Sequence, residues 1–65
     1  MSGVVEDPDG SANVRARPSL DAKIIGAAKN GERVQIEAVL PQWVRVIRDG
    51  HTGFIHKSRV RIEQE

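Results

Sequence analysis

The sequence predicts an all-β fold, a small barrel of five to seven short antiparallel strands. Apolar residues recur at every second position, as in Val34, Ile36 and Ala38, which is the period of a strand with one buried face. Turn-forming residues interrupt these runs at short intervals and leave no room for a long helix. Because many short strands protect their edges best by closing on one another, a barrel or two packed sheets is expected.

The alternation and the turn residues together locate the elements. Strands are expected at residues 4–6, 12–16, 23–28, 33–40, 43–48, 52–55 and 60–63. Tight turns are expected at Pro8-Asp9-Gly10, Arg17-Pro18-Ser19, Asn30-Gly31, Pro41-Gln42 and Asp49-Gly50. Residues 17–22 lack the alternation and should form a longer loop, and residues 56–59 should form one helical turn. The inward side chains should be Val14, Ile24 or Ile25, Val34, Ile36, Val44, Val46, Ile55 and Val60.

The length of 65 residues allows one domain, expected to span 1–65 with its core at about 4–62. A domain of this size uses nearly all its apolar residues in its own interior, so a non-catalytic protein is expected rather than an enzyme, without a cofactor. The chain has no cysteine, which excludes thiol nucleophiles, disulfides and cysteine-ligated zinc. No signal peptide is expected at its N-terminus, which has neither the basic flank nor the apolar stretch of one, and the sequence has no apolar run of ~20 residues that could span a bilayer.

Five pieces of the sequence, in order, resemble the bacterial SH3 (SH3b) domains. Residues 10–19, GSANVRARPS, resemble the opening NVRxxPS of that family, and residues 23–26 resemble its VIG strand. Residues 30–36, NGERVQI, are similar to KGxxVxV, and residues 43–46, WVRV, to WYKV. Residues 52–55, TGFI, are similar to TGWV. The resemblance implies an SH3-like barrel that binds cell-wall peptides or envelope partner proteins, often as part of an exported or envelope-associated bacterial protein.

The differences from SH3 sequences bear on the ligand. Eukaryotic SH3 domains grip proline-rich peptides with a row of aromatic side chains. Residues 53–60 resemble their GFVPxxYV motif, but His56 replaces the proline and Arg59 replaces the tyrosine of the groove. Trp43 remains as the one large flat side chain, so ordinary PxxP peptides should bind weakly or not at all.

The candidate ligand-binding residues are Trp43, Arg45, His56 and Arg59. Trp43 is out of phase with the inward Val44 and should therefore face the surface, either as a binding anchor or as a flat cover on the barrel. Arg45 is in phase with Trp43, and the resemblance brings His56 and Arg59 beside it. Together they would form an aromatic and cationic patch suited to a carboxylate or an acidic peptide; the alternative is a solvated charged face.

Other functions have weaker support in the sequence. The stretch 7–10, Asp-Pro-Asp-Gly, lacks the remaining ligands of a calcium loop and should be a plain turn. His51 and His56 have no third ligand at a zinc spacing, so no metal site is expected. The net charge of +1 excludes a general attraction to nucleic acid, although basic residues gather in the second half, at Arg45, Arg48, Lys57, Arg59 and Arg61. The main alternative is a structural domain that packs against a neighbouring domain or subunit.

Overall fold

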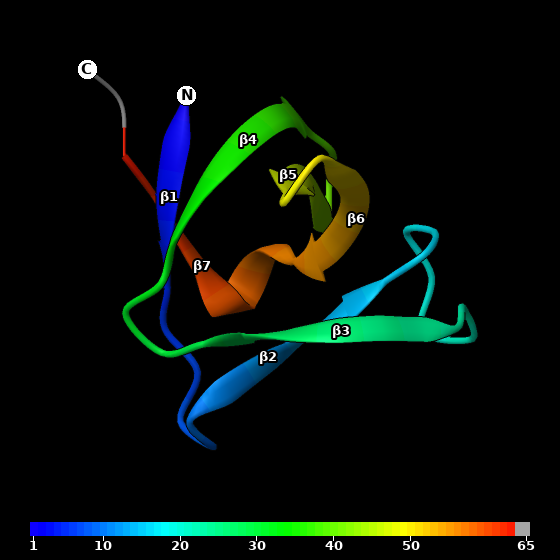
Figure 1. Cartoon of the computed structure of the whole chain (residues 1–65), viewed down its shortest axis with the longest axis horizontal. Helices are drawn as coiled ribbons and strands as arrows, with labels where there is room; N and C mark the ends of the chain where they lie inside the picture. Colours follow the sequence, from blue (N-terminus) through cyan, green and yellow to red (C-terminus); the bar gives the residue numbers. More distant parts are fainter. Residues whose placement is uncertain (64–65) are drawn as a thin grey trace.

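The computed structural model of the chain describes residues 1–63, which form seven strands and one short 3₁₀ turn (Figure 1). The elements are β1 Ser2–Val5, β2 Ser11–Arg15, β3 Ile24–Lys29, β4 Arg33–Val39, β5 Trp43–Arg48, β6 His51–His56, η1 Lys57–Arg59 and β7 Val60–Glu63. All seven expected strands are present, with their ends within two residues of the predicted positions. The helical turn expected at 56–59 is η1.

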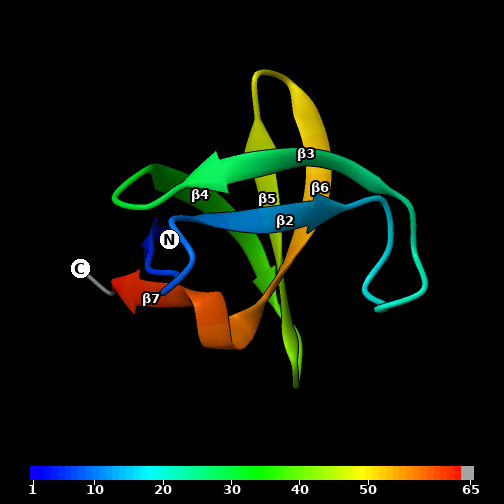
Figure 2. The ribbon, with the colours of Figure 1, turned by 90° about the horizontal axis from the view of Figure 1, so that it is seen from below.

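All seven strands belong to one antiparallel sheet, in the order β3-β2-β6-β5-β4-β1-β7. β2 joins β6 through a single register pair, Arg15 with Phe54, so the sheet folds over at this junction. Figure 2 shows the result, in which β2 and β3 run across β5 and β6. At the other end of the sheet β1 pairs with β7, which places the two ends of the described chain side by side (Figure 1). The predicted all-β barrel is therefore confirmed.

The barrel interior is filled by the inward side chains of the strands. The buried cluster comprises Val5, Ala12, Val14, Ala28, Val34, Ile36, Val44, Val46, Ile55 and Val60. The predicted core is confirmed except for Ile24 and Ile25, each of which is 48% exposed. The reason is a bulge, because Arg15 pairs with Ile24 and Val14 pairs with Gly26, which leaves Ile25 without a partner. The bulge interrupts the alternation at the start of β3.

The turns follow the sequence pattern. Asp49 and Gly50 connect β5 to β6 with φ of 50° and 80°, so both central residues of this two-residue hairpin turn have positive φ, as in a type I′ turn. The loop predicted at 17–22 connects β2 to β3, and there Ser19 accepts the backbone N–H of Asp21 on its hydroxyl at 3.2 Å. Of the described residues, none belongs to a helix long and apolar enough to cross a membrane.

Gly53 lies where β2 crosses β6. A Cβ atom at this position would collide with the Cγ1 of Val14 and would also lie 3.6 Å from the Arg15 carbonyl oxygen. The two strands therefore approach more closely than any side chain would allow. This close approach is what lets the sheet fold over.

Substitution Gly53→Ala should destabilise the domain by about 1–3 kcal/mol, because the added methyl group overpacks the crossing. Gly26→Ala is the matched control, since a Cβ there meets its nearest neighbour, Nη1 of Arg48, at an ordinary 3.5 Å. The control should change stability by less than about 0.5 kcal/mol. Urea unfolding of both variants measures the difference; equal losses would show that the crossing tolerates a side chain.

Arg48, at the end of β5, is bound to both the β3–β4 turn and the outer edge of β3. The guanidinium of Arg48 donates to both carboxylate oxygens of Glu32, at 2.8 and 3.2 Å, and also to the carbonyl oxygen of Ala27 on β3, at 3.2 Å. The hydrogen bond from Arg48 lowers the pKa of the Glu32 carboxyl below its ordinary value of 4.5. Because β3 is an edge strand, this contact also covers a backbone acceptor that another strand could use.

The Glu32 pair should stabilise the fold in a pH-dependent way. A carboxyl whose pKa is lowered by folding contributes stability above its unfolded value of about 4.5, and the contribution is lost as pH falls through the lower folded value. Glu32→Gln should therefore cost about 0.5–1 kcal/mol at pH 7, and the difference from wild type should shrink on acidification. Thermal or urea unfolding at several pH values measures it. Glu37→Gln, whose partner Arg45 is more exposed, should show a smaller difference; a pH-independent gap for Glu32→Gln would contradict the assignment.

Candidate functional site

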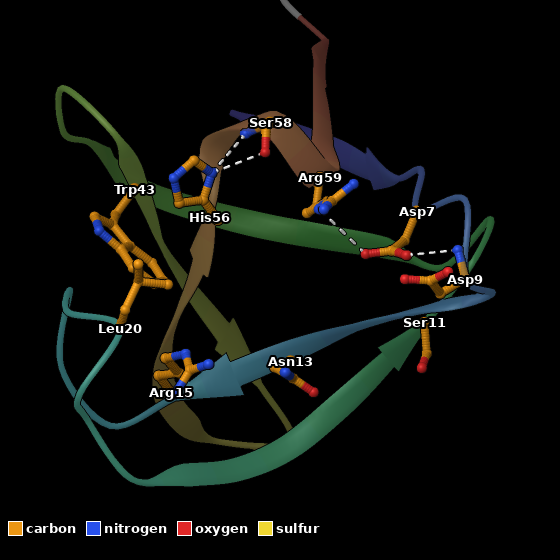
Figure 3. Close-up of a pocket in the computed structure, with 10 residues that line it drawn as sticks. All are labelled: Asp7, Asp9, Ser11, Asn13, Arg15, Leu20, Trp43, His56, Ser58 and Arg59. Atoms are coloured by element: carbon orange, nitrogen blue, oxygen red, sulfur yellow. Dashed lines mark hydrogen bonds and ion pairs between the residues drawn. The ribbon is translucent and has the colours of Figure 1, made fainter.

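A cleft of about 530 Å³ opens on one side of the barrel, between β2, the start of β5 and the segment where β6 passes into η1 (Figure 3). Its lining is mostly polar: Asp7, Asp9, Ser11, Asn13, Arg15, Leu20, Trp43, His56, Ser58 and Arg59. The cleft volume lies within the range of about 300–1,000 Å³ that is common for ligand sites.

The outer face of β2 contributes three of the lining side chains. Ser11, Asn13 and Arg15 alternate with the inward Ala12 and Val14, so the pleat of the strand sends all three to the same side. Each carries hydrogen-bonding groups, and together they form a row along one side of the cleft. Sequence analysis did not select these residues, although the alternation of polar side chains with Ala12 and Val14 was a usable signal.

Trp43 and His56 lie opposite β2. They are register partners on β5 and β6, and their ring centroids are 5.1 Å apart with an interplanar angle of 69°, an edge-to-face contact. Of the two roles expected for Trp43, an exposed anchor or a flat cover on the barrel, its burial fits the cover, because only 8% of the residue is exposed. The side chain does point outward from the pleat, but His56 packs on it and Leu20 of the β2–β3 loop lies at the same end of the cleft (Figure 3). Trp43 is thus largely a cover on the barrel, with a remaining surface that lines the cleft.

Ser58 orients the imidazole of His56. The backbone N–H of Ser58 donates to Nδ1 of His56 at 3.3 Å, and the Ser58 hydroxyl lies 2.8 Å from the same nitrogen. Because a backbone N–H can only donate, Nδ1 is an acceptor and the neutral ring carries its hydrogen on Nε2. The ring therefore has a donor, Nε2–H, left for a ligand.

A buried carboxylate holds the other end of the cleft. Asp7 is only 7% exposed, and its side chain accepts the backbone N–H of Asp9 at 2.8 Å while Nε of Arg59 lies 3.4 Å from its second oxygen. Its backbone N–H donates to the side-chain oxygen of Asn30 at 2.7 Å, and the Asn30 amide donates back to the Asp7 carbonyl at 2.9 Å. The turn expected at 7–10 is confirmed, but the burial of Asp7 could not be read from the sequence because it depends on Asn30 and Arg59.

The structure brings together three of the four predicted ligand-binding residues. Trp43, His56 and Arg59 all line the cleft. Arg45 does not line it, and its guanidinium instead pairs with Glu37 on β4, with Nε 3.1 Å from the carboxylate. Arg59 is also paired, with Asp7. The cationic character expected for this patch is therefore largely balanced by neighbouring carboxylates.

In the described part of the chain, the histidine and carboxylate side chains are too far apart to form a metal site. His51 and His56 lie at opposite ends of β6. Within residues 1–63 the structure shows no group of three or more His, Cys, Asp or Glu side chains able to hold a metal ion.

Fold and site together define a small all-β domain, a barrel with an apolar interior and a polar cleft on one side. Residues 10–61 match the family model of the bacterial SH3 domain, which is most of the chain. The chain belongs to the bacterial SH3 domain family, whose members are generally non-catalytic modules that bind proteins or peptides. No curated protein matches the sequence.

Removal of the Trp43 indole should lower the free energy of unfolding and also remove part of the cleft wall. Trp43→Ala should lose about 3–5 kcal/mol, because it leaves a cavity under Leu20 and His56. This is a large part of the few kcal/mol expected for a domain of this size. Leu20→Ala, at a neighbouring side chain that is 71% exposed, is the control and should change stability by less than about 0.5 kcal/mol. Urea unfolding followed by far-UV circular dichroism measures both, and a stable Trp43→Ala variant would show that the indole is not a structural cover.

Proposed function

We propose that this domain is a non-catalytic recognition module whose cleft binds a short extended peptide, either a bacterial cell-wall peptide or a segment of an envelope protein. The single observation that carries the proposal is the cleft itself, with a row of polar side chains on β2 facing the edge-to-face pair of Trp43 and His56. An extended peptide has a carbonyl or N–H group at every residue, and such a row can pair with them.

The chemistry of the lining favours a polar peptide over a polyproline ligand. A polyproline helix offers rings and few hydrogen bonds, and it needs a run of aromatic side chains. Here His56 and Arg59 stand where such a groove has proline and tyrosine, and both already have polar partners in Ser58 and Asp7. Cell-wall peptides are short, polar and rich in carboxylates and amides, so they suit this lining.

Nucleic acid is a poorer ligand for this surface. The basic residues of the second half of the chain include Arg45, Arg48, Arg59 and Arg61, and each of these lies within 4.0 Å of a carboxylate oxygen. A phosphate backbone is bound by uncompensated positive charge. The pairing of these arginines supports a peptide ligand.

A second candidate is a domain that packs against a neighbouring domain or subunit. Leu20, Ile24 and Ile25 favour it, because all three are large apolar side chains with 48% or more of their surface exposed. Leu20 lies in the β2–β3 loop, and Ile24 and Ile25 begin β3. Exposed apolar side chains of this size are common at protein contacts. This surface differs from the polar part of the cleft, so the two candidates can be tested separately.

The proposed function predicts that substitutions in the cleft reduce binding to purified bacterial cell walls without unfolding the domain. Asn13→Ala and His56→Ala each remove a hydrogen-bonding side chain from the cleft and should weaken retention by about five- to tenfold. Gln35→Ala, at an exposed polar residue of β4 outside the cleft, is the control and should bind as wild type does. A cosedimentation assay with walls, and nuclear magnetic resonance titration with soluble muropeptides, measure the effect. A wild-type domain that neither sediments with cell walls nor shows chemical-shift changes with muropeptides would favour the packing domain instead.

A further inference from the structure

Arg15 differs from the other arginines of the chain in its charge environment. Among residues 1–63, five of the seven arginines have a carboxylate oxygen within 4.0 Å, namely Arg33, Arg45, Arg48, Arg59 and Arg61. The other two are Arg15 and Arg17. Arg17 is exposed in the β2–β3 loop, whereas Arg15 is half-buried on β2 and lines the cleft.

The position of the Arg15 guanidinium is set by a neutral partner. Its Nη1 donates to the carbonyl oxygen of Ala22 at 2.9 Å, and Ala22 is itself buried at the end of the β2–β3 loop. This bond occupies one of the five N–H donors of the guanidinium and leaves its positive charge uncompensated. In Figure 3 the side chain lies on the cleft side of β2, at the same end as Leu20 and Trp43.

An arginine that is partly withdrawn from water without a counter-charge favours binding of an anion. Desolvation of the cation is unfavourable, and a carboxylate in the cleft would offset it with charge-assisted hydrogen bonds to the planar guanidinium. A carboxylate ligand would gain much less from Arg59, because Asp7 already pairs with its guanidinium. The positive end of the cleft is therefore at Arg15 and not at the two arginines that the sequence singled out.

We propose that Arg15 binds a carboxylate of the peptide ligand and thereby selects peptides that carry a carboxylate next to an apolar group. The carboxylate pairs with the guanidinium, while the apolar group packs against Leu20 and the remaining surface of Trp43. This inference rests on the proposed peptide-binding function and specifies which chemistry the ligand must have. The carboxylate can be a C-terminus or an acidic side chain, and Arg15 would bind either.

The test uses three synthetic peptides and the intact domain. The peptides are acetyl-Leu-Ala-Ala with a free C-terminus, the same peptide with a C-terminal amide, and acetyl-Leu-Glu-Ala with a C-terminal amide. Each is titrated while the Trp43 indole N–H and the backbone amides of β2 are followed by ¹⁵N–¹H correlation spectra. The free acid should bind at least about tenfold more tightly than its amide, because a charge-assisted bond is lost in the amide. Comparison with the glutamate peptide shows whether a terminal or a side-chain carboxylate is preferred.

Variants of the two unpaired arginines separate a local contact from general charge attraction. Arg15→Gln should bind the free acid about tenfold more weakly and should no longer distinguish the acid from the amide. Arg17→Gln removes the same charge outside the cleft and should stay within about twofold of wild type. Arg15→Lys keeps the charge but loses the planar fork, and an intermediate affinity is expected. If Arg15→Gln does not fold, the Arg15→Lys variant and the amidated peptide on the wild type still decide the question.

The outcomes distinguish this inference from the function on which it rests. If acetyl-Leu-Ala-Ala amide, which has no carboxylate, binds in the cleft with the same affinity as the two peptides that carry one, Arg15 is not a carboxylate site. The peptide-binding function would then still stand. Equal losses in Arg15→Gln and Arg17→Gln would also overturn the inference, because they indicate a diffuse electrostatic effect. If none of the three peptides perturbs the cleft, and cell walls and muropeptides do not bind, both proposals are overturned.

Discussion

The close crossing of β2 over β6 is the constraint on which the rest of this structure depends. Gly53 has no side chain, and this lets Val14 of β2 lie directly against the backbone of β6. The crossing folds one seven-stranded sheet back over itself, so that residues 1–63 enclose an apolar interior without an α-helix, and without a disulfide because the chain has no cysteine. It also turns the outer, polar face of β2 towards the segment that carries Trp43 and His56. Core and cleft are thus two consequences of a single close contact.

Within the cleft, the charges divide into those that hold the structure and those that remain for a ligand. Asp7 and Arg59 neutralise each other, and the same carboxylate fixes the turn that leads into β2. The guanidinium of Arg15 is held by the neutral backbone carbonyl of Ala22, which sets its position without supplying a negative charge. The partial burial of Arg15 strengthens this contrast with Arg59. An unpaired guanidinium interacts more favourably with an incoming carboxylate when less water surrounds it.

The cleft lies where Trp43 and the 3₁₀ turn η1 come together, and its chemistry differs from that of an aromatic SH3 groove. His56 and Arg59 provide polar groups at the two positions where eukaryotic SH3 motifs have proline and tyrosine. A ligand would then be recognised through hydrogen bonds along β2 and one charged contact, with a smaller apolar contribution from Trp43 and Leu20. Under the proposed function, such a surface would bind short, polar peptides with modest affinity, because each polar contact must replace water.

The sequence by itself determined the strands, the turns and the family, because these depend on local patterns such as the alternation Val34, Ile36 and the Asp49-Gly50 turn. It also located Trp43, His56 and Arg59 in one region through the resemblance. Only the tertiary structure decided how each side chain is surrounded. The bulge opposite Val14 exposed Ile24 and Ile25, and packing from His56 covered an indole that points outward. The tertiary structure also decided which arginines have a carboxylate partner and which, like Arg15, do not. Ion pairs form between residues distant in the chain, so no local sequence pattern predicts them.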